Sequence, residues 1–270
     1  MANIDHIMPN PVVVPILWGH DYVANPATAT SLQQMVSDLV TGPFMNGLAQ
    51  YGIHRGSMQT PTIIDDQNPP AKTLYYDTNN NLQDDITKKL VQWINAGLVP
   101  PPQSANDINN LYLIFPPPET TPETFNNQGD PIGNGIQGWH NEGVTNPAPP
   151  PVYYWAIVKT NDVGPASATQ SFVNGVSPKI SHELVEQLAD RNGSFEELGD
   201  PCNNTLVNYR GWSVQQYHSD WDNTCINGDN PVSLKRFLTA INFDFQNNGL
   251  LSLGTSAISI NYIATTMQSH

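Results

Sequence analysis

Short apolar runs recur along the chain and predict buried β-strands. A run of four to eight apolar residues bounded by turn-forming residues is typical of a strand that is covered on both faces. The run at 12–19 contains Pro15, which lacks a backbone N–H, so we expect an edge position or a bulge there. The remaining strand candidates are residues 57–64, 111–115, 152–159 and 257–264.

Apolar residues at helical spacing predict helices between these strands. In 82–98 they recur every three to four positions, and Gly97 and Pro100 mark the end of the helix. Further helices are expected at 28–40, at 44–51, from Ser177 to Gly193, and at 232–242. Strands that alternate with helices favour an α/β fold with a largely parallel, twisted sheet.

Residues 116–151 are rich in Pro, Gly and Asn, which predicts a long loop of the kind that often carries function. We expect residues 1–270 to form a single domain, or that domain with a C-terminal subdomain at 227–270.

The charge balance excludes some classes of partner. Acidic residues outnumber basic ones by 24 to 10, which gives a net charge of −14. Nucleic acids and anionic membranes bind basic surfaces, so neither is expected as a partner. Apolar runs are too short for a membrane-spanning helix, and residues 1–10 do not resemble a signal peptide. The chain is therefore expected to be either the mature form of an extracellular protein or a cytoplasmic protein.

The chain contains two cysteines, Cys202 and Cys225. A disulfide that closes a loop of this length stabilises a fold by about 3 kcal/mol in the loop-entropy model. Two buried free thiols in a reducing compartment are the alternative. Triplets that can accept N-linked glycans, at Asn192 and Asn203, favour an exported protein and with it the disulfide.

The predicted helix after Ser177 carries the residues most suited to chemistry. Ser177 and Pro178 are typical of a helix start, and 192–193 (Asn-Gly) is typical of a helix end. Residues four apart on a helix lie one above the other, so His182 and Glu186 can bind the same metal ion. Glu183 lies beside them, where it can take a proton from water bound to that ion. The alternative for this segment is a solvated helix face with one histidine.

An acidic segment follows the helix and offers a third ligand. Glu197 and Asp200 precede Cys202, which can fix the turn that carries them. A carboxylate from either residue would complete a set of three protein ligands, as in catalytic zinc sites. An acidic loop without a metal is the alternative.

Six short motifs occur in a fixed order along the chain: PILWG at 15–19, GPFMNGLAQY at 42–51, GWH at 138–140, SHELVE at 181–186, ELGDPC at 197–202 and VQQY at 214–217. Together they resemble a family of bacterial and fungal HExxE metallopeptidases, which is related to the plant EXORDIUM (phosphate-induced) proteins. The resemblance covers residues 12–226. It departs from the family at 189–191, where Ala-Asp-Arg replaces the usual T-D-P.

This resemblance implies a zincin-like fold and a zinc-dependent metallopeptidase that acts on peptides or proteins. Zinc would be held by His182, Glu186 and a carboxylate from Glu197 or Asp200, and Glu183 would be the general base. Calcium is the alternative metal for a set so rich in carboxylates.

His140 is a candidate for binding substrate or metal, and a histidine bonded to the backbone is its structural alternative. Two other functions stay open for the whole chain. One is a non-catalytic secreted binding or signalling protein with a structural metal. The other is carbohydrate recognition through exposed aromatic residues and Asn-rich loops.

Overall fold

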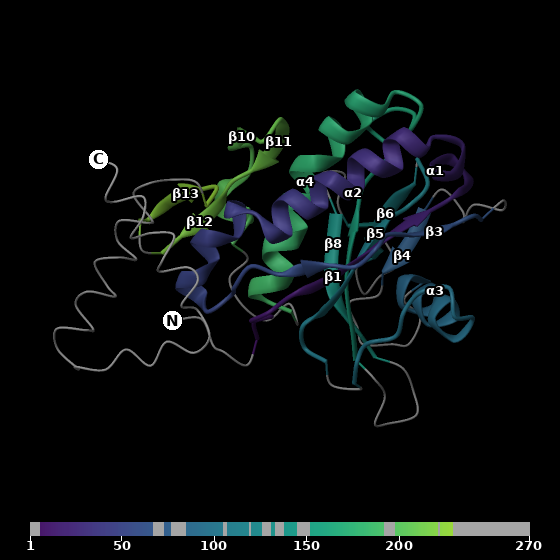
Figure 1. Cartoon of the computed structure of the whole chain (residues 1–270), viewed down its shortest axis with the longest axis horizontal. Coiled ribbons are helices and arrows are strands. Elements are labelled where there is room, and N and C mark those ends of the chain that lie inside the picture. The colour runs from purple at the N-terminus through teal and green to yellow at the C-terminus, as the bar shows by residue number, and fades with distance from the viewer. Residues whose placement is uncertain are drawn as a thin grey trace. The chain divides into compact units, whose positions relative to one another are not determined.

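A mostly parallel β-sheet forms the centre of the fold (Figure 1). β1 pairs in parallel with β5, and β5 in parallel with β9, while β8 closes one side antiparallel to β9. On the other side of β1 lie β2 and β3, both parallel to it. The bounds of these strands are β1 Val12–Trp18, β2 Ser57–Met58, β3 Thr62–Ile64, β5 Asn110–Phe115, β8 Gly138–Val144 and β9 Val152–Val158. The expected α/β fold with a mostly parallel sheet is thus confirmed.

The computed structural model describes residues 6–66, 73–76, 85–104, 107–118, 120–125, 131–132, 138–144, 152–191, 198–220 and 222–228. All of them belong to one compact unit, Met1–Asn230. The expected helix at 232–242, the strand at 257–264 and the proposed subdomain from residue 229 onward lie outside the described residues.

Of the two positions expected for Pro15, an edge or a bulge, the edge is wrong, because β1 lies inside the sheet. β5 covers one side of β1 along its length, and two short strands cover the other side. β2 ends opposite Val13, and β3 begins opposite Ile16. Pro15 therefore falls at the gap between β2 and β3, where a backbone N–H has no regular partner to meet. A central strand can accommodate proline because its neighbour is interrupted at that position.

Side chains of the central strands alternate between two apolar cores, one on each face of the sheet. Val13, Leu113 and Ala156 belong to the larger core, with the helices α2 and α4. Val14 and Trp155 face the smaller core, with α3. Figure 1 shows α2 and α4 side by side. The helices are α1 His20–Ala24, α2 Pro26–Thr41, η1 Pro43–Tyr51, α3 Asp85–Asn95, α4 Thr169–Ala189 and the short η2 Asp200–Cys202.

Smaller strands complete the described fold. The segment 116–151, expected to be a loop, contains β6, β7 and β8, so that expectation is wrong for these parts. β4 pairs with β6, β6 with β7, β10 with β11, and β12 with β13. Their bounds are β4 Thr73–Tyr76, β6 Thr121–Phe125, β7 Pro131–Ile132, β10 Leu206–Tyr209, β11 Trp212–Gln215, β12 Tyr217–Ser219 and β13 Thr224–Ile226.

Cys202 and Cys225 form a disulfide in the last part of the described residues, with their Cα atoms 5.7 Å apart. The bond joins η2 to β13 and confirms the prediction of a disulfide. None of the helices in the described part of the chain has the length and apolar composition needed to cross a membrane.

Candidate metal centre

The helix that carries the motif is longer than expected. α4 begins at Thr169, so Ser177 is not its N-cap, and it ends at Ala189, before the Asn-Gly pair. Pro178 lies inside the helix, where its missing N–H leaves the carbonyl oxygen of Asn174 without its usual donor. The Ser177 hydroxyl lies 3.4 Å from that oxygen, but its one proton is donated to the closer carbonyl oxygen of Ser213 in β11, at 2.7 Å. This bond to β11 helps to hold a serine-proline pair, typical of a helix start, in the middle of a helix.

α4 buries both its apolar and its acidic residues. Ile180, Leu184 and Leu188 face the larger core, as their spacing predicts. Glu183 and Glu186 are also almost fully buried, at 3% and 2% exposure. A buried carboxylate is costly unless it is paired, hydrogen-bonded or bound to a metal. The surroundings of these two carboxylates therefore indicate what the site can do.

One group of potential metal ligands contains the predicted pair and Asp200. His182 Nε2 lies 3.0 Å from Oε2 of Glu186 and 3.8 Å from Oδ1 of Asp200. One ligand atom from each of the three residues lies within 4.8 Å of the others, which is close enough to hold one ion. The structure thus brings together three of the four predicted ligands, while Glu197 lies outside the described residues.

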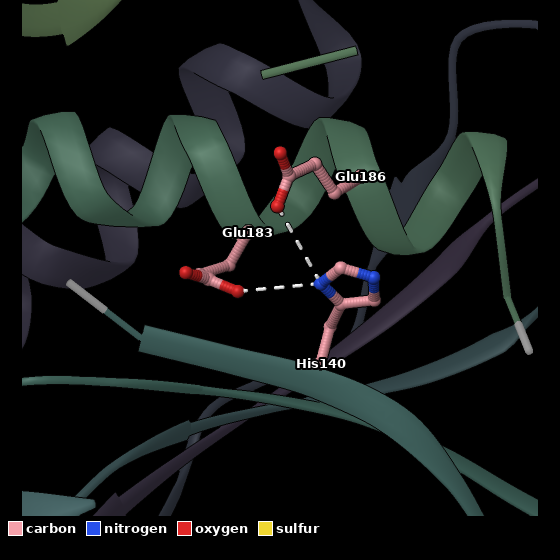
Figure 2. Close-up of side chains that lie close together, drawn as sticks. All are labelled: His140, Glu183 and Glu186. Atoms are coloured by element: carbon pink, nitrogen blue, oxygen red, sulfur yellow. Dashed lines mark hydrogen bonds and ion pairs between the residues drawn. The ribbon is translucent and has the colours of Figure 1, made fainter. Parts of the chain in front are cut away.

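A second group overlaps with the first and includes His140 (Figure 2). His140 extends from β8 toward α4, and its Nδ1 lies 3.4 Å from Oε2 of Glu183 and 3.6 Å from Oε2 of Glu186. The same oxygen of Glu186 therefore faces both histidines. His140 lies next to the predicted general base, a contact between residues 43 positions apart.

One buried oxygen supports the fit of a metal. Among the residues that the structure describes, Oε1 of Glu186 accepts no hydrogen bond, although it is shielded from solvent. An unpaired buried carboxylate oxygen costs free energy, and a bound cation would offset that cost. Imidazole nitrogens with carboxylate oxygens are donors that suit zinc and several other divalent ions.

The charges in this cluster shift two pKa values. Burial alone would lower the pKa of His182, but the hydrogen bond with Glu186 and the charges of Glu183, Glu186 and Asp200 raise it to about 9. Burial raises the pKa of Glu183, and the nearby Glu186 raises it further, against the opposing effect of His140. A raised carboxyl pKa brings a group closer to the range in which it exchanges protons at neutral pH.

Two glycines allow the ligand-bearing segments to approach one another. A Cβ atom at Gly199 would lie 2.7 Å from both Oε1 of Glu186 and Nδ1 of His182. A Cβ atom at Gly138 would lie 2.6 Å from Cγ of Glu183. Each glycine therefore leaves room for the side chain of a candidate site residue.

Gln215 belongs to the site but was not singled out from the sequence. Its Nε2 lies 2.7 Å from Nδ1 of His182 and donates a hydrogen bond of 2.9 Å to the carbonyl oxygen of Gly199. Gln215 belongs to the VQQY motif, but the sequence does not indicate its contact with His182, because that contact depends on the tertiary structure.

Asp200 approaches the site from a short, cross-linked segment. It begins η2, and Cys202 of the same element forms the disulfide to Cys225. Asn203 Nδ2 donates to Oδ1 of Asp200 at 3.2 Å, which orients the carboxylate. The backbone N–H of His218 donates to the carbonyl of Leu198, just before this segment. The third candidate ligand is thus held in place from both sides.

The fold and the site define a mixed α/β protein with a buried His/Glu/Glu group that can hold a metal ion. No family model matches the chain, and neither a curated protein nor a solved structure matches it.

Proposed function

We propose that the chain is a metal-dependent peptidase with a zincin-like fold, and that zinc is its metal. The observation that carries the proposal is the His182–Glu186 pair on α4, with Asp200 beside it and Glu183 at the adjacent position. The motif resemblance of residues 12–226 supports the same reaction class. The disulfide supports an extracellular location, because such bonds persist in oxidising compartments.

His182, Glu186 and Asp200 would hold the metal in this proposal. A zinc ion held there would supply Lewis acidity toward a carbonyl group and would lower the pKa of a bound water to about 7. Three protein ligands leave a fourth position open, which is typical of catalytic rather than structural zinc.

Glu183 would take the proton from the attacking water and later pass it to the leaving amine. Its carboxylate is buried at 3% exposure, and it follows His182 directly in the chain. The raised pKa of Glu183 agrees with this role, since a general base acts best when its pKa lies near the working pH. The role itself rests on the position of the carboxylate beside the ligands.

His140 would orient Glu183. Its Nδ1 lies 3.4 Å from Oε2 of Glu183, and its side chain is only 6% exposed. A hydrogen bond from this ring would fix the carboxylate on the side of the site that faces β8. The same ring can also stabilise negative charge that develops on the substrate.

A catalytic assay with matched variants tests the proposal. Wild-type protein loaded with one equivalent of zinc should cleave an unfolded, fluorescently labelled protein. Glu183→Gln has nearly the same shape and should keep the zinc, while hydrolysis falls by about 10²–10⁴, the usual contribution of an acid–base group. His182→Ala should lose both zinc and hydrolysis. Wild-type protein that binds no zinc, or that binds zinc and cleaves nothing, would refute the proposal.

A second function is favoured by one specific contact. Oε2 of Glu186, a residue that both groups of potential ligands share, lies 3.6 Å from Nδ1 of His140, so a shift of this ring toward the ion would add His140 as a fourth protein ligand. Four protein ligands are typical of a structural zinc site. The chain would then be a non-catalytic binding or signalling protein whose metal stabilises α4 against β8. X-ray absorption spectra that count the nitrogen ligands of bound zinc distinguish two histidines from one.

A further inference from the structure

We infer that Gln215 is a positioning residue that accepts the Nδ1 proton of His182 and thereby holds the ring with Nε2 directed at the metal. The inference rests on the proposed function, because it concerns the same metal site. It starts from the geometry of one buried amide group that contacts a candidate ligand and the backbone next to another.

Two serines on α4 fix the strand that carries Gln215. The Ser177 hydroxyl donates to the carbonyl oxygen of Ser213 at 2.7 Å, and the backbone N–H of Gln215 donates to Oγ of Ser181 at 2.8 Å. All three of Ser177, Ser181 and Gln215 are buried. Because these serines lie one helical turn apart, they hold β11 alongside α4, and the Gln215 side chain lies beside His182.

The orientation of the His182 ring determines which nitrogen is free to bind a metal. Nε2 faces Glu186 and Asp200, whereas Nδ1 faces Gln215. A metal must therefore bind at Nε2. A neutral imidazole ring carries one proton, so in the metal-bound state that proton must be on Nδ1 and needs an acceptor.

The Gln215 amide can serve both states of the ring. With Nε2 of Gln215 toward the ring, at 2.7 Å, the amide donates to an unprotonated Nδ1, which suits a neutral ring whose proton lies on Nε2. Rotation of the amide by half a turn presents its oxygen to the same atom and accepts the proton of Nδ1. Partners of this kind hold a metal-binding histidine in the required tautomer and orientation.

The amide also links the two segments that bring the ligands. Nε2 of Gln215 donates to the carbonyl oxygen of Gly199 at 2.9 Å, and Asp200 is the next residue. In this orientation one side chain connects the ring of His182, on α4, to the backbone that places Asp200. Rotation of the amide that turns its oxygen to Nδ1 gives up the bond to Gly199. Gln215 touches neither the expected position of the ion nor that of the substrate, so its effect acts through these two residues.

Two substitutions separate the acceptor role from general packing. Gln215→Met and Gln215→Glu both lose the hydrogen bond to Gly199. Only the glutamate can still accept a proton from Nδ1 of His182. The neighbouring Gln216, whose amide donates to the carbonyl of Cys225, provides the control Gln216→Met.

The measurement is the zinc dissociation constant, obtained by competition with a chromogenic chelator, with the melting temperature of the metal-free protein recorded for each variant. Gln215→Met should bind zinc about 10–100-fold more weakly than wild type, the usual effect of losing such a partner. Gln215→Glu should bind it much more tightly than Gln215→Met, and Gln216→Met should match wild type.

Three results would overturn the inference. The inference is wrong if Gln215→Met binds zinc as tightly as wild type. It is also wrong if Gln215→Glu binds zinc as weakly as Gln215→Met, because the loss of affinity would then come from packing alone. In both cases zinc binding by the wild type leaves the proposed function intact. Wild-type protein that binds no zinc removes the proposed function and the inference together.

Discussion

Nε2 of His182 lies 3.0 Å from Oε2 of Glu186, one helical turn further along α4. Both atoms face the side from which Asp200 approaches, and Oε2 of Glu186 also faces His140. A single carboxylate oxygen is therefore shared by two groups of potential ligands. Substitution of each histidine in turn distinguishes which of the two groups binds the ion.

We expect His182→Ala to abolish stoichiometric zinc binding, whereas His140→Ala keeps most of it. His182 and Glu186 supply two ligands from one rigid helix, while His140 approaches from β8 and contacts Glu183 as well. Zinc content after dialysis, measured by mass spectrometry of the metal, provides the test. His54→Ala is the control, because His54 is exposed and outside both groups.

Loss of zinc in His140→Ala but not in His182→Ala would move the metal to the second group. Glu183 would then be a ligand rather than the general base.

The metal-free protein should show a pH-dependent contribution of His182 to stability. Burial lowers the pKa of this ring, but Glu186 and the other carboxylates raise it overall to about 9, against an ordinary value of 6.5. A pKa that is higher in the folded state stabilises the fold fully below pH 6.5, and the contribution disappears as the pH rises through about 9.

Melting temperatures of wild type and His182→Gln in a metal chelator provide the measurement. The difference between them should be largest near pH 6 and should shrink toward pH 10. A difference that stays constant over this range would contradict the raised pKa. Zinc competes with the same proton, so zinc affinity should rise with pH over the same interval.

Gly199→Ala should weaken zinc binding without unfolding the protein. The backbone of Gly199 has φ −77° and ψ −41°, which alanine adopts without strain, so the effect comes from the added methyl group. That group would lie 2.7 Å from atoms of both His182 and Glu186 and would displace them. The zinc dissociation constant and the melting temperature together provide the test.

Gly164→Ala serves as the control for backbone strain. Gly164 has a positive φ, with open space around the position of a Cβ atom, so alanine there should lower stability and leave zinc affinity unchanged. Equal zinc affinities for wild type and Gly199→Ala would show that the ligands lie further from Gly199 than the structure places them.

Removal of the disulfide should destabilise the described fold. The Cys202–Cys225 bond spans 23 positions, and the loop-entropy model gives about 3 kcal/mol for a loop of that length. Denaturant unfolding of the Cys202→Ala/Cys225→Ala double variant should show a loss of that order. Titration of the denatured, unreduced wild type should find no free thiol, and two free thiols would rule the bond out.

The local parts of the fold could be predicted because they depend on spacing. The apolar stripe of α3 and the continuous apolar runs of β5 and β9 each follow from the period of their own residues. The same holds for His182 and Glu186, whose separation of four places them on one face of any helix.

The features of the fold and the site that the sequence does not predict are those where distant segments of the chain meet. β8 carries polar residues and glycines, so its sequence does not have the pattern of a strand, and its pairing with β9 was not predicted. The contact of His140 with Glu183 depends on that pairing. Ser177 and Pro178 look like a helix start because both residues favour that position, and the bond from Ser177 to β11 that holds them in mid-helix is tertiary.

The unequal exposure of the ligands has a kinetic consequence. The side chain of Asp200 is 57% exposed, whereas those of Glu186 and His182 are 3% and 11% exposed. An ion would therefore enter and leave past Asp200, and its residence time would depend on how tightly that segment is held. The cross-link through Cys202 restrains this segment, so reduction should speed metal exchange more than it weakens equilibrium binding. In this protein the rate at which the metal is lost would then report the redox state of its surroundings.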